Sequence, residues 1–274
     1  MRLLFLGDIV GKTGRSVVYE KLPNLIREFK LDFVIANGEN SASGFGITEK
    51  IFLDIIDVGV DVVTTGNHVW DKREALIFSQ RYHNFLRPAN YPTGTHGNGY
   101  GLYKAKNGSN VLVANIMGQV FMNPILDNPF MVSNKILETC ILKEQADVIV
   151  FDFHAETTSE KQCFAHFVDN RASIVVGTHT HIPTADARIL YGGTGYISDI
   201  GMCGDYNSSI GIDKEEPINR CITKIPKNRF AVAEGEATLC GICAEISDKN
   251  GLTEKIAPIR IGPNIKETIP DFWN

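Results

Sequence analysis

The sequence predicts an α/β protein with strands packed in two layers. Two observations carry this prediction. In the N-terminal half, apolar runs alternate with segments of helical periodicity, in the order strand, helix, strand, helix, strand. Near the C-terminus the pattern changes to the alternation that antiparallel strands show. Hydrophobic residues make up 43% and charged residues 22% of the 274 residues, which is typical of a globular chain with a core.

The first half of the chain predicts a parallel sheet. Its elements, in order, are a strand at 2–7, a helix at 14–29, a strand at 32–37, a helix at 48–59 and a strand at 61–65. The first strand is an apolar run that ends in glycine, as expected of a strand buried on both faces. The second helix begins at Thr48, a residue suited to an N-cap, and closes at Gly59. We therefore expect the helical connections between these parallel strands to be right-handed crossovers.

The second half of the chain predicts a further set of strands and helices. Residues 88–101 are rich in Pro, Gly and Asn and predict an irregular loop. The elements expected after it are strands at 111–116, 147–153 and 173–177, helices near 133–145 and 158–169, and antiparallel strands within 229–246 and at 256–261. No segment has the composition of a linker, so we expect a single domain over residues 1–274.

Composition excludes several classes of function. The formal net charge is -5, so we expect no stable binding of long nucleic acid, and no apolar run is long enough to cross a membrane. The six cysteines are scattered, which predicts free thiols in a reducing compartment and therefore a cytoplasmic protein. The single CxxC motif, Cys240 to Cys243, lies in a predicted strand and is expected to be structural.

Polar residues follow five of the predicted strands at their carboxyl ends, where α/β sheets bind ligands. The candidate metal ligands among them are Asp8, Glu39, Asn67, His154, His179 and His181. Nitrogen and oxygen ligands without thiolate suit Mn, Fe, Zn or Co. Six ligands are too many for one catalytic ion with open positions and suffice for two ions that share a carboxylate. Three other histidines, His83, His96 and His166, lie outside this pattern.

The order of these motifs resembles the calcineurin-like metallophosphoesterases, and most closely their YmdB-like branch. The matching segments are GDIVGKTGR from Gly7, NGENSASGFGIT from Asn37, TGNHVWDK from Thr65, DFHAETTSEK from Asp152, VVGTHTHIPTAD from Val175 and SDIGMCG from Ser198. The chain lacks the Asp-x-His and GDxxD motifs of the wider superfamily, as the YmdB-like branch also does. The resemblance implies helices on both sides of a two-sheet core, in α/β/β/α layers.

The resemblance also implies a role for each site residue. Asp8, Glu39 and His181 would hold one divalent ion, and Glu39, Asn67, His154 and His179 the second. Asn40 would contact a metal or the substrate phosphate. His68 would act as the general acid. Phe45 either stacks on a base from a substrate loop at 41–47 or belongs to a connecting turn.

The implied activity is hydrolysis of 2′,3′-cyclic nucleotides. Two transition-metal ions, Fe or Mn with Zn as an alternative, would supply a bridging hydroxide that attacks phosphorus, and His68 would protonate the leaving oxygen. A role in RNA decay or signalling would suit such an enzyme. The only partner expected is a small phosphodiester, and exposed strand edges in the C-terminal part allow a homo-oligomer.

Two alternatives stay open on sequence alone. Residues 7–13 lie between a strand and a helix, where the phosphate-binding loop of an NTPase belongs. The motif needs four residues between its first glycine and Gly-Lys-Thr, but only three separate Gly7 from Gly11, and Leu6 stands where the glycine is required. The second alternative is a metal-bound regulatory protein with little turnover.

Overall fold

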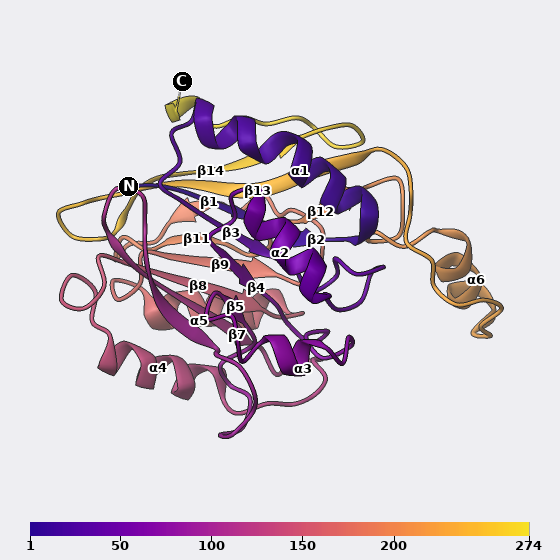
Figure 1. Cartoon of the computed structure of the whole chain (residues 1–274), viewed down its shortest axis with the longest axis horizontal. Helices are drawn as coiled ribbons and strands as arrows, with labels where there is room; N and C mark the ends of the chain where they lie inside the picture. The colour runs from indigo at the N-terminus through magenta and orange to yellow at the C-terminus, as the bar shows by residue number, and fades with distance from the viewer. Residues whose placement is uncertain (274) are drawn as a thin grey trace.

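The computed structural model describes residues 1–273 and shows a mixed α/β fold with two stacked sheets (Figure 1). The strands are β1 (Arg2–Leu6), β2 (Asp8–Ile9), β3 (Phe33–Asn37), β4 (Val62–Thr64), β5 (Phe85–Leu86), β6 (Tyr100–Lys104), β7 (Asn110–Met117), β8 (Val148–His154), β9 (Ile174–Thr178), β10 (Arg188–Ile189), β11 (Gly195–Ile197), β12 (Met202–Asp205), β13 (Ala237–Ile246) and β14 (Thr253–Ile261). The helices are α1 (Gly11–Glu28), α2 (Glu49–Asp57), α3 (Ala75–Phe78), α4 (Pro129–Thr139), α5 (Thr158–Val168), α6 (Glu215–Thr223) and the short 3-10 helix η1 (Asp271–Trp273).

The first sheet joins the two ends of the chain. Its strand order is β2-β12-β13-β1-β3-β4-β5, with β14 paired to β13. Strands β1, β3, β4 and β5 are parallel to one another, as the strand–helix alternation predicts. Strand β13 is antiparallel to both β1 and β14, which confirms the antiparallel pattern predicted for the C-terminal part.

The second sheet has the order β10-β11-β9-β8-β7-β6. Its centre, β7, β8 and β9, is parallel, so the carboxyl ends of these strands lie at one edge. Strand β8 is buried along its whole length, which explains its continuous apolar sequence up to the polar residues at its end.

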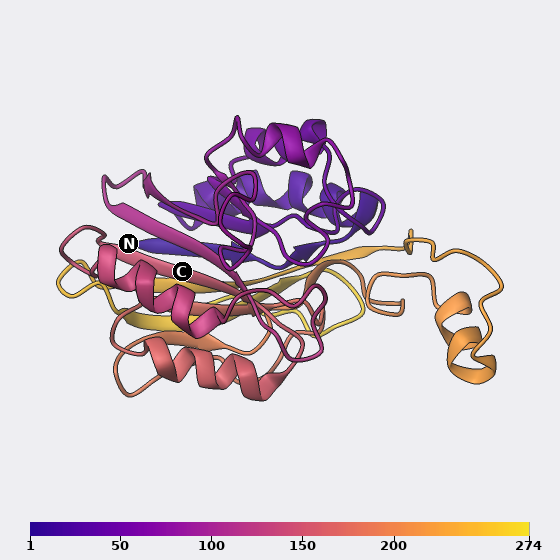
Figure 2. The same cartoon turned by 90° about the horizontal axis from the view of Figure 1, so that it is seen from below.

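Side chains that alternate along each strand build the layers. In β1, Leu3 and Phe5 face the second sheet, whereas Leu4 and Leu6 pack under the helices. Helices α1 and α2 cover the outer face of the first sheet, and α4 and α5 cover the outer face of the second (Figures 1 and 2). The predicted α/β/β/α order of layers is confirmed.

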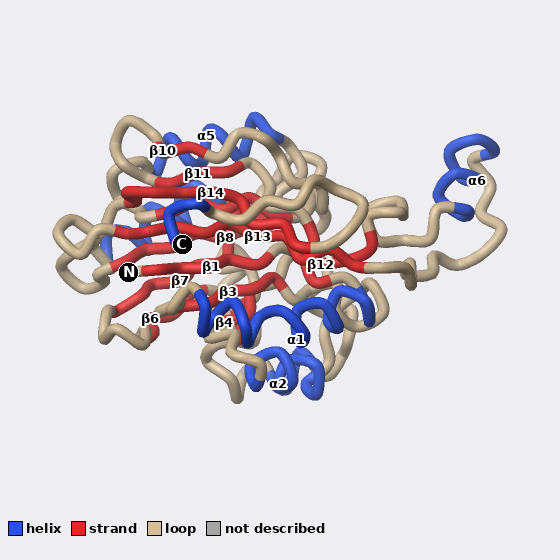
Figure 3. The backbone as a smooth tube through the Cα atoms, turned by 90° about the horizontal axis from the view of Figure 1, so that it is seen from above, coloured by secondary structure: helices blue, strands red, loops and turns tan. Residues whose placement is uncertain are grey.

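One segment leaves these layers. Between β12 and β13 the chain extends away from the body and carries α6 at its far end (Figures 2 and 3). The expectation of strand from residue 229 is therefore wrong for residues 229–236, which precede β13 in this segment. Their alternating sequence predicts a strand, but a strand needs a continuous neighbour. Pairing of β13 begins at Ala237, opposite Asp205 of β12, and before it Val232 forms only an isolated bridge to Ile212.

Other boundaries also differ from those predicted. Helix α4 occupies residues 129–139 and not 133–145, because the Asn128 side chain accepts hydrogen bonds from the N–H groups of Phe130 and Met131 and Pro129 opens the helix. Helix α1 begins at Gly11, three residues before the predicted start. Strand β6 begins at Tyr100, inside the segment predicted as loop. The predicted boundaries of α2 and α5 hold to within about two residues.

The cysteines of the described residues are free thiols. Cys240 and Cys243 are both buried in β13, where residues three apart point to opposite faces of the sheet, so the structural interpretation of this CxxC motif is supported. Among the helices formed by residues 1–273, none combines the length and apolar character needed to cross a membrane.

Candidate metal centre

The predicted site residues meet at the edge where the strands of both sheets end. Asp8 lies in β2 and Glu39 follows β3. Asn67 follows β4 in the same sheet. The second sheet contributes His154, the last residue of β8, and His179, which follows β9. The fold therefore brings together ligands that are separated by more than half of the chain.

The tightest convergence is at Nε2 of His154. This nitrogen lies 3.1 Å from Oε1 of Glu39, 3.0 Å from Oδ1 of Asn67 and 3.1 Å from Nδ1 of His179. One ring nitrogen carries at most one hydrogen, so it cannot donate to all three partners. Several nitrogen and oxygen acceptors lie close together here with too few hydrogens between them, and a bound cation would stabilise this arrangement. Ligand atoms of Glu39, His154 and His179 all lie within 4.8 Å of one another.

Buried oxygens without partners extend this cluster. Oδ1 of Asp8 and Oδ1 of Asn40 are both buried and accept no hydrogen bond. Oδ1 of Asp8 is 4.0 Å from Nε2 of His181. A buried acceptor without a donor costs about 1–3 kcal/mol, so these atoms are positioned for a ligand that supplies positive charge. The donor set fits one or more divalent cations.

Gly66 leaves the space that this cluster needs. A Cβ atom at residue 66 would lie 2.2 Å from Nε2 of His154 and 2.5 Å from Oε2 of Glu39. No side chain fits there, because the Cβ itself would occupy the space between the ligands. The glycine of the Gly-Asn-His motif is therefore a requirement of the site.

Hydrogen bonds on the far side of two histidines fix their orientation. Nδ1 of His154 lies 2.9 Å from Oγ1 of Thr178, whose hydroxyl donates to the buried Asp152. Nδ1 of His181 lies 2.8 Å from the carbonyl oxygen of Ile210. In both rings Nδ1–H is the donor, which turns Nε2 toward the cluster, as is common for histidines that bind metals.

The charges in the cluster are strongly coupled. Burial tends to raise the pKa of Glu39, but His154, His68 and His179 lower it to about 2, so this carboxylate is charged at neutral pH. Burial tends to lower the pKa of His154, but Glu39 and Asp8 raise it to about 9. Burial and the charge of His154 lower the pKa of His179 to about 3, so the ring is uncharged at neutral pH and one of its two nitrogens has a lone pair free to bind a cation.

A buried ion pair supports the turn that carries His179 and His181. Asp199 accepts hydrogen bonds from the N–H and the hydroxyl of Thr180, between the two histidines. Nζ of Lys161 lies 2.9 Å from the same carboxylate, and both side chains are 1% exposed. The turn needs this support because His179 and His181 have positive φ angles of 99° and 66°, which are unfavourable for residues with a Cβ.

His68 differs from the cluster ligands. Its backbone N–H donates to Oε2 of Glu39, but its ring points elsewhere: Nδ1 lies 2.8 Å from Oδ2 of Asp71. The ring of Phe45 packs against it edge-on, with 5.0 Å between the centroids. The hydrogen bond to Asp71 engages Nδ1 of the ring and not Nε2.

Two cavities are lined in part by His68 and His179. A small cavity of about 110 Å³ is lined by six predicted site residues, namely Glu39, Asn40, Phe45, His68, His179 and His181. A larger cavity of about 480 Å³ is lined by Asn67, His68, His179, Asp71 and the loop segment Phe121 to Pro124. Both cavities therefore adjoin residues of the cluster.

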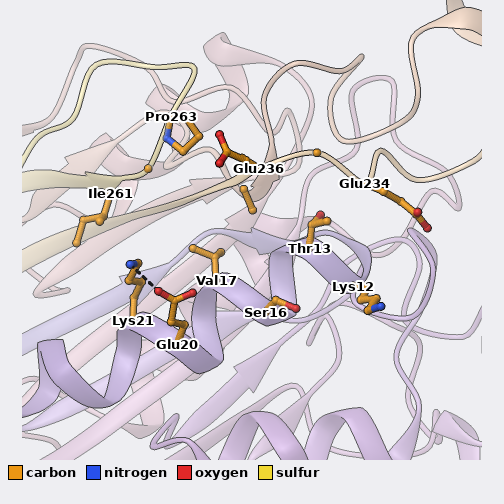
Figure 4. Close-up of a pocket in the computed structure, with 13 residues that line it drawn as sticks. Lys12, Thr13, Ser16, Val17, Glu20, Lys21, Glu234, Glu236, Ile261 and Pro263 are labelled. Atoms are coloured by element: carbon orange, nitrogen blue, oxygen red, sulfur yellow. Dashed lines mark hydrogen bonds and ion pairs between the residues drawn. The ribbon is translucent and has the colours of Figure 1, made fainter.

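A third cavity bears on the NTPase alternative. Lys12 and Thr13 line a groove of about 430 Å³ along α1, together with Lys21 and three glutamates, Glu20, Glu234 and Glu236 (Figure 4). Three carboxylates against two ammonium groups do not attract a triphosphate. The N–H groups of Gly7, Val10 and Gly11 are bound to the carbonyl oxygens of other segments, so these three groups are not free to hold a phosphate. The geometry does not support this alternative.

The stacked sheets and the histidine–carboxylate cluster at their strand ends define the class of protein as the calcineurin-like phosphoesterases. The sequence matches the family described as YmdB-like protein over residues 4–259, and the chain belongs to that family. It is 46% identical over 261 residues to the 2′,3′-cyclic-nucleotide 2′-phosphodiesterase of Bacillus subtilis (strain 168), covering 95% of this chain and 97% of that protein. The predicted family is confirmed.

Two solved structures share the whole fold. A hypothetical protein from Thermus thermophilus is 39% identical, with a TM-score of 0.88 over 96% of this chain and 100% of that chain. A protein described as a novel phosphatase from Mycoplasma pneumoniae is 32% identical, with a TM-score of 0.88 over 96% of this chain and 93% of that chain. Relatives named phosphodiesterase and phosphatase agree with the predicted enzyme class.

Several residues at the site are absent from the sequence-based set. Asp71 follows His68 by three residues in the motif TGNHVWDK and contacts its ring. Nε2 of His179 lies 3.1 Å from Oε2 of Glu156, which is in the motif that contains His154. These two residues are within matched motifs and were accessible to sequence reasoning. Phe121 lies outside those motifs, and its place at the site follows only from the fold.

Proposed function

We propose that this protein is a metal-dependent phosphodiesterase that hydrolyses 2′,3′-cyclic nucleotides. The observation that carries the proposal is the convergence of Glu39, Asn67 and His179 on Nε2 of His154, within 3.1 Å. The relative from Bacillus subtilis, named for this substrate class, supports it across nearly the full length of both chains. We retain a cytoplasmic location and a single domain over residues 1–274 as predictions.

The chain's own residues suggest how two cations would be held. Asp8 and His181 would hold one cation, and Asn67, His154 and His179 would hold the other. The carboxylate of Glu39, whose Oε1 lies 3.1 Å from Nε2 of His154, would be shared by both. The unpartnered Oδ1 of Asn40 would face a cation or a phosphoryl oxygen. When bound, divalent ions of this kind neutralise phosphoryl charge and lower the pKa of water to near 7. Iron, manganese and zinc all suit these ligands.

His68 would act as the proton donor to the leaving oxygen. Asp71 accepts the hydrogen of Nδ1, which fixes the ring and directs Nε2 toward the cavities. Phe45 packs on the other side of the ring and restricts its rotation. Phe45 also lines the small cavity, so its role as a substrate contact stays a prediction.

The first experiment is hydrolysis of 2′,3′-cyclic AMP by metal-stripped protein, with and without Mn²⁺. The comparators are 3′,5′-cyclic AMP and p-nitrophenyl phosphate. We expect turnover of the 2′,3′-cyclic diester that depends on the metal and exceeds turnover of both comparators. A protein that binds two metal ions and hydrolyses none of the three compounds would instead favour the regulatory interpretation.

The variant His68→Ala is expected to keep its metal ions and to lose turnover by about 100- to 10,000-fold, the range typical of general acid catalysis. The reason is that the ring contacts Asp71 and Phe45, whereas the cluster contact of residue 68 is its backbone N–H. Metal content by elemental analysis and kcat are the measurements. His166→Ala, at an exposed position on α5, is the matched control and should match the wild type. Loss of metal from His68→Ala would show that His68 is a ligand.

A further inference from the structure

A loop that the site assignment does not use lies beside the metal centre. We propose that residues 118–128 form a platform for the nucleobase, with Phe121 as the residue on which the base stacks. This inference rests on the proposed function, because it says where the base of the proposed nucleotide substrate binds, while the cluster binds its phosphate. Phe121 lines the 480 Å³ cavity together with Asn67, His68 and His179.

Phe121 has an unusual conformation for an aromatic residue. Its side chain is 87% exposed, although phenylalanine is usually buried, and its φ angle is +62°. A bulky residue in the left-handed region is rare and costs free energy. Exposure and strain at the same residue, next to a reactive centre, indicate a ligand contact and not a packing role.

The loop is held in place before any ligand arrives. The carboxylate of Glu160, on α5, accepts hydrogen bonds from the N–H groups of Gln119 and Val120, at 2.8 and 3.2 Å. The side chain of Asn90 bonds the loop at both ends, at Met117 and at the carbonyl oxygen of Asp127. An ordered loop loses little entropy when a ligand binds, so the exposed ring is preorganised.

Apolar packing anchors the loop under its tip. Met122 and Leu126 are buried in a small cluster with Met117, and Tyr91 packs against it. These neighbours of Phe121 face inward while its own ring stays outside. The loop therefore has its own core, and the exposure of Phe121 is not the result of missing packing around it.

Cavity size decides which aromatic residue takes the base. Binding pockets for small organic ligands typically span about 300–1,000 Å³. The cavity at Phe121 measures about 480 Å³ and lies within this range, whereas the cavity at Phe45 measures about 110 Å³ and lies below it. The ring of Phe45 already packs against His68. The base therefore occupies the larger cavity, which Phe121 lines, and not the smaller cavity at Phe45.

The lining of the larger cavity matches a ligand with two different ends. Phe121, Met122 and Pro124 offer apolar surface, and Asn67, His68 and His179 offer the polar side that faces the cluster. A cyclic nucleotide has a phosphodiester at one end and a flat aromatic base at the other. Stacking on an aromatic ring accepts any base, since every base has a π face, so the platform selects nucleotides over other cyclic diesters without selecting one base.

The test compares a nucleotide with a diester that has no base. For Phe121→Ala we expect KM for 2′,3′-cyclic AMP to rise by about tenfold or more, with KM for glycerol 1,2-cyclic phosphate unchanged. Phe121→Trp should have a KM for 2′,3′-cyclic AMP close to that of the wild type, whereas Phe121→Leu should show the raised KM of Phe121→Ala, because only tryptophan keeps a π face. Ile125→Ala is the matched control: this residue is also apolar and 76% exposed on the same loop, but it does not line the cavity.

Equilibrium binding of adenosine 3′-monophosphate separates this inference from the proposed function. We expect Kd to increase about tenfold or more in Phe121→Ala and to match the wild type in Ile125→Ala. If the wild type hydrolyses neither diester, the proposed activity fails, and the titration still decides the platform. An unchanged Kd and an unchanged nucleotide KM in Phe121→Ala would overturn the platform, and so would an equal rise in KM for both diesters.

Discussion

Glu39→Gln protein is expected to lose bound metal and to fall by at least about 100- to 1,000-fold in kcat/KM, the effect of losing several kcal/mol of charge stabilisation. Glutamine has nearly the shape of glutamate, so the change removes the charge with little change in volume. Glu39 is buried, its pKa is lowered to about 2, and one of its oxygens lies 3.1 Å from His154. It is also the carboxylate that we propose two cations would share.

The measurements for Glu39→Gln are metal content, kcat/KM and thermal unfolding. Chelation of the wild type should produce the same loss of activity, and added Mn²⁺ should restore the wild type but not the variant. Glu138→Gln, an exposed position on α4, is the matched control and should behave as the wild type. A Glu39→Gln protein with full metal content and full activity would contradict the assignment of Glu39 as a shared ligand.

Lys161→Met is expected to reduce the free energy of unfolding by about 3–5 kcal/mol, the usual effect of breaking a buried ion pair. Methionine keeps most of the side-chain length but leaves the carboxylate of Asp199 buried without its cation. Asp199 also bonds Thr180, so the turn that carries His179 and His181 loses its support. We therefore expect metal affinity to fall together with stability.

Denaturant unfolding and metal titration measure the two effects of Lys161→Met. The matched control is Lys255→Met. It breaks the ion pair between Lys255 on β14, whose side chain is 51% exposed, and Glu245 on β13, whose side chain is 20% exposed, and it should change the free energy of unfolding by no more than about 1 kcal/mol. Equal stability of Lys161→Met and the wild type would show that the buried pair contributes nothing net. Unchanged metal affinity in Lys161→Met would show that the ion pair is not needed to hold the turn that carries His179 and His181.

The members of the candidate site could be predicted from short stretches of sequence, whereas the boundaries of the helices and strands around them could be predicted less well. Asp8, Glu39, Asn67, His154 and His179 each come at or directly after a strand, and a strand is visible in sequence as a local apolar run. The carboxyl ends of parallel strands meet at one edge, so the members of the cluster could be predicted before their distances were known. The helix and strand boundaries could be predicted less well, because caps such as Asn128 shift them by a few residues.

The fold class and the family could be predicted from the sequence alone, and so could the members proposed for the candidate metal centre, because strand periodicity and motif order are local properties of the chain. Three features could be read only from the folded chain: the atoms that converge on Nε2 of His154, the ion pair that supports the histidine turn, and the cavity that Phe121 and His68 line together. The ion pair joins residues 38 positions apart, and the loop at Phe121 depends on Asn90 and Glu160, from distant parts of the chain. Contacts of this kind follow from how the two sheets and their loops pack, and no local pattern in the sequence records them.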